Sequence, residues 1–134
     1  MAKITSVSPL APARFPDLPA IGGARFATTA AGVKYVGRSD VMLALLDPGS
    51  VIAGVFTKSA TRSANVLDCQ EKIRLSDENG AAILVNSGNS NAFTGRAGDD
   101  SVRAICAAVA EVSGLPATRV FTGATGVIGE LLPD

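Results

Sequence analysis

The sequence predicts an α/β fold on three observations. Residues 41–46, 51–56 and 81–85 form almost wholly apolar runs, which is typical of strands that are covered on both faces of a sheet. Residues 101–113 carry apolar side chains at spacings of three and four, which predicts a helix. The length of 134 residues leaves room for only one domain.

The first half of the chain predicts an arm followed by two hairpins. Residues 1–23 are rich in proline and should form an extended arm, so the domain itself occupies residues 24–134. Residues 25–35 suggest a hairpin of two short strands, 25–29 and 33–35.

The second hairpin should join the apolar runs 41–46 and 51–56. Between them lies Asp47-Pro48-Gly49-Ser50, in which proline presets the first central angle and glycine accepts a positive φ at the second. This pattern predicts a type II turn.

The second half predicts two helices and two strands. Asn65 is the expected N-cap of a helix over 66–75. Asp99 or Asp100 is the expected N-cap of the helix over 101–113, and Gly114 should end that helix. The strands are expected at 81–85 and 120–122.

A glycine-rich loop, 123–126, follows the last strand, and the chain ends at Asp134 without an element that completes the sheet. We therefore expect the N-terminal portion of a larger domain, incomplete without a downstream chain. Two helices cannot cover such a sheet, which predicts tight association with the missing part or self-association.

Composition excludes several classes of function. Twelve Lys and Arg balance twelve Asp and Glu, and aromatic residues make up only 4%, which argues against a nucleic-acid partner. No apolar run approaches the roughly 20 residues that span a bilayer, so no membrane partner is expected. Histidine is absent, which removes Ser-His-Asp catalysis and histidine metal sites; we expect neither a metal nor a bound cofactor.

Cys69 and Cys106 are expected to be buried thiols in a reducing compartment, which favours a cytoplasmic protein. Cys106 has no neighbour in sequence that would lower its pKa and make it a nucleophile. The scattered cations are expected to be solvated; they are Lys58, Arg62, Lys72, Arg74 and Arg103.

Two loops are candidates for chemistry. Residues 86–95 are rich in Asn, Ser and Gly, and such a loop either orients a polar substrate or satisfies its own backbone. In the loop 123–126, small residues let adjacent backbone amides approach one oxygen, as in an oxyanion hole, and the Thr125 hydroxyl offers a third donor. The other interpretation is an ordinary glycine turn.

Taken together, these segments resemble the N-terminal portion of the ornithine acetyltransferase family, the bifunctional glutamate N-acetyltransferases of arginine biosynthesis. The segments that carry the resemblance lie in the family's order and extend over nearly the whole chain; they are Ala30–Lys34, Asp40–Leu46, Ala53–Thr57, Leu84–Ala92 and Thr125–Gly129. Ala124, Ser90 and Phe93 depart from the residues common in the family.

The resemblance implies a four-layer α/β/β/α sandwich of the self-processing type with an N-terminal nucleophile. It implies a precursor that cleaves itself at an Ala-Thr bond downstream of this chain, giving an α chain and a β chain that assemble as a heterotetramer of two of each. The new terminal Thr would carry acetyl from N-acetylornithine to glutamate, with acetyl-CoA as a possible co-substrate.

Only one catalytic element carries over by residue. Thr125 and Gly126 match the pair that the family uses as its oxyanion hole, whereas the nucleophile and the substrate contacts are expected downstream of Asp134. Two other functions stay open: a related self-processing aminopeptidase or amidase, and a noncatalytic module that binds a small anion.

Overall fold

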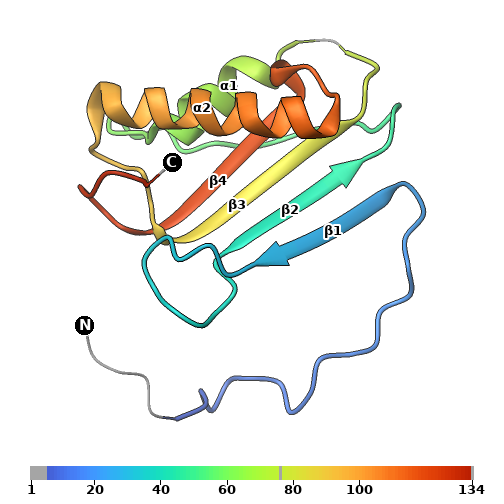
Figure 1. The fold of residues 1–134 in the computed structure, drawn as a ribbon, viewed down its shortest axis with the longest axis vertical. Coiled ribbons are helices and arrows are strands. Elements are labelled where there is room, and N and C mark those ends of the chain that lie inside the picture. Colours follow the sequence, from blue (N-terminus) through green and yellow to red (C-terminus); the bar gives the residue numbers. More distant parts are fainter. Residues whose placement is uncertain (1–5, 76, 134) are drawn as a thin grey trace.

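The computed structural model describes residues 6–75 and 77–133 and contains a four-stranded sheet with two helices (Figure 1). The elements, in chain order, are β1 (Ala24–Thr29), β2 (Val41–Leu46), α1 (Ala64–Lys72), β3 (Ala81–Asn89), α2 (Gly95–Ser113), a short 3-10 helix (Ala117–Arg119) and β4 (Val120–Val127). The predicted α/β fold class agrees with this mixture of sheet and helices; a second sheet is not among the described elements.

The strands lie in the order β1-β2-β3-β4, so each strand pairs with its neighbour in sequence. The first two pairs are antiparallel, while β4 runs parallel to β3. Because parallel neighbours need a crossover, α2 fills the connection between β3 and β4.

Both helices lie on the same side of the sheet in Figure 1, with α1 close to the edge strand β4. The core between them and the sheet is small and closely packed. Its buried members are Ala64, Ala82, Val102, Cys106, Val109 and Val120. Val102 and Val109 of the helical stripe predicted from sequence therefore face the sheet, whereas Val112 of the same stripe is 80% exposed.

Residues 51–56 do not form the predicted strand. β2 already pairs with β1 and β3 on its two edges, so no edge remains for a hairpin partner. The segment instead packs Ile52 and Phe56 against the cluster of Cys69, Ala81 and Phe121. Phe121 and its register partner Ile83 alternate away from the face that carries Ala82 and Val120. The turn itself is as predicted: Ser50 N donates to Asp47 O over 3.2 Å, and Gly49 has a φ of +86°.

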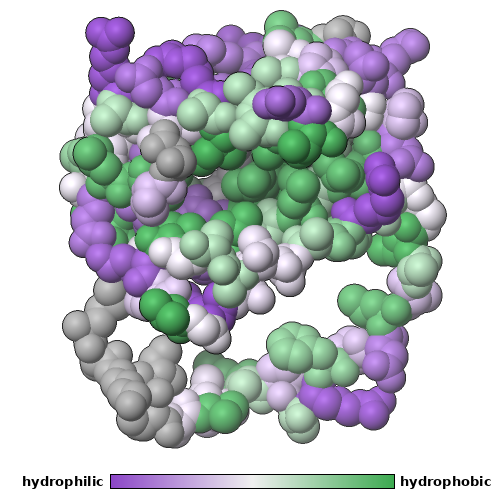
Figure 2. All heavy atoms as spheres, in the orientation of Figure 1, coloured by the Kyte–Doolittle hydropathy of each residue, from purple (hydrophilic) through white to green (hydrophobic). Residues whose placement is uncertain are grey.

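This second face of the sheet is only partly covered. Phe26 of β1, which is in register with Ala44 of β2 and hence on the same face as Ile83, is 65% exposed. Figure 2 shows hydrophobic residues gathered over the middle of the molecule and again along the N-terminal arm. Residues 6–23 contain no helix or strand, and their large apolar side chains are exposed.

The first hairpin pairs β1 with β2, and the predicted strand 33–35 is wrong. The reason is Asp40, which is 3% exposed and accepts hydrogen bonds from the backbone amides of Ala31 and Val33, both over 2.7 Å. These two bonds hold the connection after β1 in a turn. The hairpin partner of β1 is therefore β2 and not residues 33–35.

The helix starts also differ from the predictions. The N-cap of α1 is Ser63, and Asn65 lies inside the helix with its side chain buried. α2 begins at Gly95 with Thr94 as its N-cap, so Asp99 and Asp100 are helical residues rather than caps. The end at Gly114 is as predicted, with a left-handed φ of +72°.

Lys72 is not solvated as predicted but joins α1, α2 and β4. Its ammonium donates to Asp68 Oδ2 over 2.7 Å, to Cys106 Sγ over 3.1 Å and to the carbonyl of Val120 over 3.0 Å. Its side chain is only 12% exposed. Burial by itself lowers the pKa of Lys72, but the hydrogen bonds to Asp68 and Cys106 outweigh it, so the pKa is raised.

Replacing Lys72 with methionine is expected to destabilise the fold by about 1–3 kcal/mol at neutral pH, since it removes hydrogen bonds from a charged donor. The folded pKa of Lys72 lies above its unfolded value, so this stability is complete below the unfolded pKa of about 10.4 and is lost as the pH rises through the folded pKa. Urea titrations from pH 7 to 11 should therefore show the two proteins converging in alkali. A constant difference across that range would contradict the ion-pair explanation.

Candidate functional site

Several chain segments meet at one end of the sheet. Since β3 and β4 are parallel, their carboxyl ends lie together, and the β1–β2 connection reaches the same end, as do the start of α2 and the start of α1 (Figure 1). The outer side of the carboxyl ends of parallel strands is where open α/β sheets bind ligands. Both loops that were singled out from the sequence lie here.

Thr125 and Gly126 do not lie in the predicted loop but near the carboxyl end of β4. Thr125 is in register with Ser87 and Asn89 of β3, and Gly126 with Gly88. The pairing shifts register between Gly88 and Asn89, which marks a bulge. Both Thr125 and Gly126 are exposed.

The bulge changes what the amides of these two residues can do. In a regular strand, adjacent N–H groups point to opposite edges and cannot approach one atom. Gly126 departs from that geometry with a φ of +139°, and β4 is an edge strand of the sheet formed by the described residues, which place no further strand on its outer side. The backbone at Gly126 is therefore not held to the alternation of a regular strand.

Glycine at 126 is required by close backbone contact as well as by conformation. A Cβ at this position would lie 2.2 Å from the carbonyl carbon of Gly88 and 2.5 Å from the amide nitrogen of Asn89. Such distances are far inside van der Waals contact, so a side chain would push β4 away from β3.

The asparagines of the predicted 86–95 loop hold backbone together. Asn86, still within β3, donates to the carbonyl of Asn89 over 2.8 Å. Asn89 donates to the carbonyls of Glu130 and Leu131, both over 3.1 Å, and thereby fixes the segment after β4. The structure thus favours the self-satisfied interpretation of this loop for these two side chains.

Asn91 is the centre of a buried polar cluster between the helix starts. It is fully buried and donates to Asn65 Oδ1 over 3.2 Å and to the carbonyl of Gly98 over 3.0 Å, while its own oxygen accepts from Thr94 Oγ1 over 2.8 Å. Asn65 in turn donates to Thr122 Oγ1 over 2.8 Å. The cluster ties α1 and α2 to β4.

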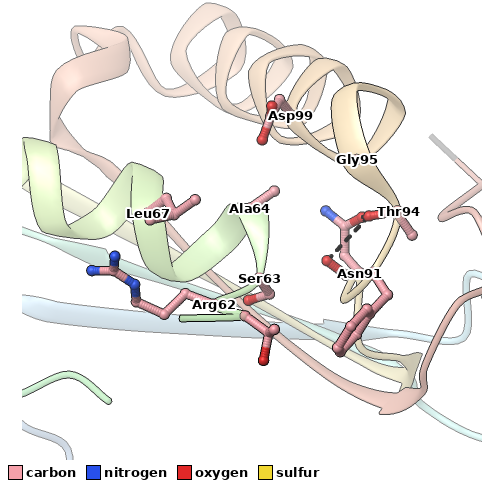
Figure 3. A pocket seen from close by; sticks show the side chains of 10 residues that line it. Arg62, Ser63, Ala64, Leu67, Asn91, Thr94, Gly95 and Asp99 are labelled. Carbon is pink, nitrogen blue, oxygen red and sulfur yellow. Dashed lines mark hydrogen bonds between the residues drawn. The ribbon is translucent and has the colours of Figure 1, made fainter. Parts of the chain in front are cut away.

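A cavity of about 250 Å³ opens between the starts of α1 and α2 (Figure 3). It is lined by Thr61, Arg62, Ser63, Ala64, Leu67, Asn91, Phe93, Thr94, Gly95 and Asp99. In Figure 3 the Arg62 side chain extends along α1 away from Asn91, which agrees with its bond to Gln70 Oε1 over 2.9 Å. The cavity is separate from Thr125 and Gly126, which do not line it.

The sequence analysis missed two residues at this end of the sheet. One is the Asp40 carboxylate described above, and the other is Lys34, whose ammonium pairs with Glu130 Oε2. Lys34 lies directly over Gly88: a Cβ on that glycine would be 2.6 Å from the Cβ of Lys34. The sequence did offer a signal for Asp40, because an Asp stands just before an apolar strand. It offered none for Lys34, whose partner lies 96 positions away.

Other candidates from the sequence lie away from this end. Burial raises the pKa of the Cys106 thiol, although the Lys72 ammonium opposes that effect, so this thiol lacks the lowered pKa that characterises an activated nucleophile. Arg103 is exposed and pairs with Asp100. Within residues 6–75 and 77–133, no group of three or more acidic or cysteine side chains is arranged to hold a metal ion. In the same part of the chain, no helix combines the length and apolar character needed to cross a membrane.

Proteins of similar sequence carry one name. The protein from Ruegeria pomeroyi called arginine biosynthesis bifunctional protein ArgJ is 68% identical over 130 residues, which cover 97% of this chain and 32% of that protein. A protein of the same name from Nitrobacter winogradskyi is 49% identical over 132 residues, covering 96% and 31%. The chain therefore spans about a third of the length of the curated relatives it matches.

Solved structures agree with the sequence comparison. The crystal structure of arginine biosynthesis bifunctional protein ArgJ from Bacillus halodurans matches with a TM-score of 0.76 and 34% identity over 84% of this chain and 58% of that one. Ornithine acetyltransferase from Mycobacterium tuberculosis, solved in complex with ornithine, matches with a TM-score of 0.72 and 35% identity over 84% and 60%. The model of the ArgJ family matches residues 25–134. On these matches, and in agreement with the resemblance seen in its motifs, this chain belongs to the ArgJ family.

Proposed function

We propose that this chain is the α-chain portion of an acetyltransferase that moves acetyl from N-acetylornithine to glutamate in arginine biosynthesis. The observation that supports this most is the exposed end of β4, where Gly126, next to Thr125, takes a φ of +139° beside the register shift at Gly88 and Asn89. In this proposal their amides, with the Thr125 hydroxyl, stabilise the oxyanion of each tetrahedral intermediate.

The nucleophile comes from outside this chain. A Thr at the start of a β chain attacks the acetyl carbonyl of N-acetylornithine, and its own α-amino group takes the hydroxyl proton. Ornithine leaves with that proton, and an acetyl-Thr ester remains. The α-amine of glutamate then attacks the ester, the bond between the acetyl group and the Thr oxygen breaks, and a proton from the amine returns to that oxygen as N-acetylglutamate leaves. Acetyl-CoA is a possible alternative donor in the first step.

The lengths of the similar proteins support a precursor that is divided into two chains. The chain covers 58–60% of the two solved chains but only 31–32% of the curated relatives. The solved chains are thus much shorter than full-length sequences of the family, as expected for a precursor cleaved into α and β chains. We further propose a heterotetramer of two of each, formed in the cytoplasm, where the two free cysteines would stay reduced.

The exposed apolar face of the sheet fits the same proposal. Phe26 is mostly exposed on a face that residues such as Ile52 and Phe56 cover only in part, and a second sheet packed there would complete the α/β/β/α sandwich. Whatever covers this face in the assembled enzyme would come from the downstream part of the polypeptide.

The test is to join this chain to the remaining two thirds of the Ruegeria pomeroyi relative, as one reading frame. We expect the chimera to transfer acetyl from N-acetylornithine to glutamate, with N-acetylglutamate measured by mass spectrometry. Neither piece alone should do so. Release of free acetate in place of N-acetylglutamate would indicate an amidase, and a folded, processed chimera without either product would contradict the proposal.

A further inference from the structure

Lys72 and Cys106 place a primary amine directly beside a thiol. They come from α1 and α2 and are 34 positions apart in sequence, yet the Lys72 nitrogen lies 3.1 Å from the Cys106 sulfur. The hydrogen bonds of Lys72 explain why a cation lies here, but they make no use of the reactivity of a thiol next to an amine. When a thiol is oxidised to sulfenic acid, its sulfur becomes an electrophile, and a nitrogen in contact with it can attack.

We propose that Cys106 and Lys72 form an oxidative modification site, at which hydrogen peroxide generates a covalent bond between Sγ and Nζ. The bond joins α1 to α2 beside β4, where Lys72 also binds the carbonyl of Val120. This inference does not depend on the proposed acetyl transfer, since every residue that it uses lies within this chain.

The modification takes two steps. The Cys106 sulfur attacks one oxygen of hydrogen peroxide, the O–O bond breaks, and a sulfenic acid and water form; the sulfur is oxidised and the peroxide is reduced. The Lys72 nitrogen then attacks that sulfur, the S–O bond breaks, and a second water leaves. The product is a sulfenamide, and the protein has lost one hydrogen from the thiol and one from the amine.

Asp68 is the base that the second step needs. As an ammonium, Lys72 must give up a proton before its nitrogen attacks, and Asp68 Oδ2 accepts a hydrogen bond from it over 2.7 Å. The same oxygen lies 4.0 Å from the Cys106 sulfur. One carboxylate therefore contacts both reacting groups, and its side chain is 22% exposed, so the proton can pass on to solvent.

A small oxidant can approach the pair from a cavity between the two helices. This cavity of about 220 Å³ is lined by Asp68 of α1 and by Val102, which lies about one turn before Cys106 on α2. Hydrogen peroxide is close to water in size, and such a volume holds several water molecules. Cys106 itself is only 3% exposed, which keeps larger disulfide oxidants away from it.

Cys69 provides a comparison within the same chain. It is also buried, but its thiol donates to the carbonyl of Thr122 over 3.4 Å, and no lysine of the described residues is hydrogen-bonded to it. Burial raises the pKa of both thiols, and at Cys106 the hydrogen bond from Lys72 is the main opposing effect. Only a sulfenic acid at Cys106 therefore forms in contact with an amine.

The test treats the folded chimera with increasing concentrations of hydrogen peroxide. After proteolysis, tandem mass spectrometry should find the peptides of residues 72 and 106 linked, with a mass two hydrogens below their sum, and dithiothreitol should separate them again. Lys72→Arg is the matched variant, because it keeps a cation beside the thiol but its guanidinium does not lose the proton that attack requires. It should form no linked peptides and should stop at a sulfenic acid that dimedone traps.

Two cysteine variants separate this cross-link from a disulfide, whose formation also removes two hydrogens. The linked peptides should persist in Cys69→Ser and be absent in Cys106→Ser, and this pair of variants decides the test if Lys72→Arg does not fold. A bond between Cys69 and Cys106, a linked product that retains oxygen, or a Cys106 that stays reduced or is oxidised without joining Lys72 would each overturn the proposal. Acetyl transfer is not measured, so failure of the proposed function is a separate result.

Discussion

Replacing Gly126 with alanine in the chimera is expected to lower kcat for acetyl transfer by about 100- to 1,000-fold, the usual effect of losing one oxyanion donor. The reason is steric, since the new Cβ would lie 2.2 Å from the carbonyl carbon of Gly88. The φ of +139° is also one that alanine does not adopt without strain. The end of β4 must therefore move, and its amides with it.

Gly123→Ala is the matched control on the same strand. Its Cβ would have its nearest neighbour, Val85, at 3.6 Å, and its backbone φ is not positive, so activity should stay within about twofold. Gly126→Pro is a second variant that deletes the amide itself and should slow self-cleavage as well as transfer. Gly126→Ala with unchanged kcat and cleavage rate would remove the oxyanion role from this site.

Asn91→Asp is expected to destabilise the assembled protein by about 3–5 kcal/mol at neutral pH, as when a buried charge is left without a partner. The two side chains have the same shape, so packing is preserved. A carboxylate cannot donate, however, and the oxygens of Asn65 and Gly98 that accept from Asn91 would face a negative charge. Urea denaturation of the chimera measures the loss.

The pH dependence tests that cause. The buried Asp would have a folded pKa above its unfolded value, so its penalty is present at neutral pH and shrinks as the pH falls and the carboxyl takes up a proton. Gln70→Glu likewise replaces an amide with a carboxylate, but it keeps an oxygen that accepts the exposed hydrogen bond from Arg62, so it should cost within about 0.5 kcal/mol at any pH. A loss at Asn91 that does not change with pH would point to packing instead of charge.

The sequence by itself determined those features that depend on neighbouring residues. The strand at 81–85, the helix over 101–113, the type II turn at Pro48-Gly49 and the stop at Gly114 follow from apolar periodicity and from the backbone angles that proline and glycine favour. The family motifs are local in the same sense, since each is a short run of residues. These features do not depend on which residues pack against them in the folded protein.

Only the tertiary structure decided how these elements pair. An apolar run such as 51–56 looks like a strand, but a strand requires a free edge, and β1 and β3 occupy both edges of β2. The burial of Lys72 against Cys106 and Val120 and the pairing of Lys34 with Glu130 likewise depend on residues far away in sequence. The free energy that fixes them comes from contacts between distant segments, which local patterns do not contain.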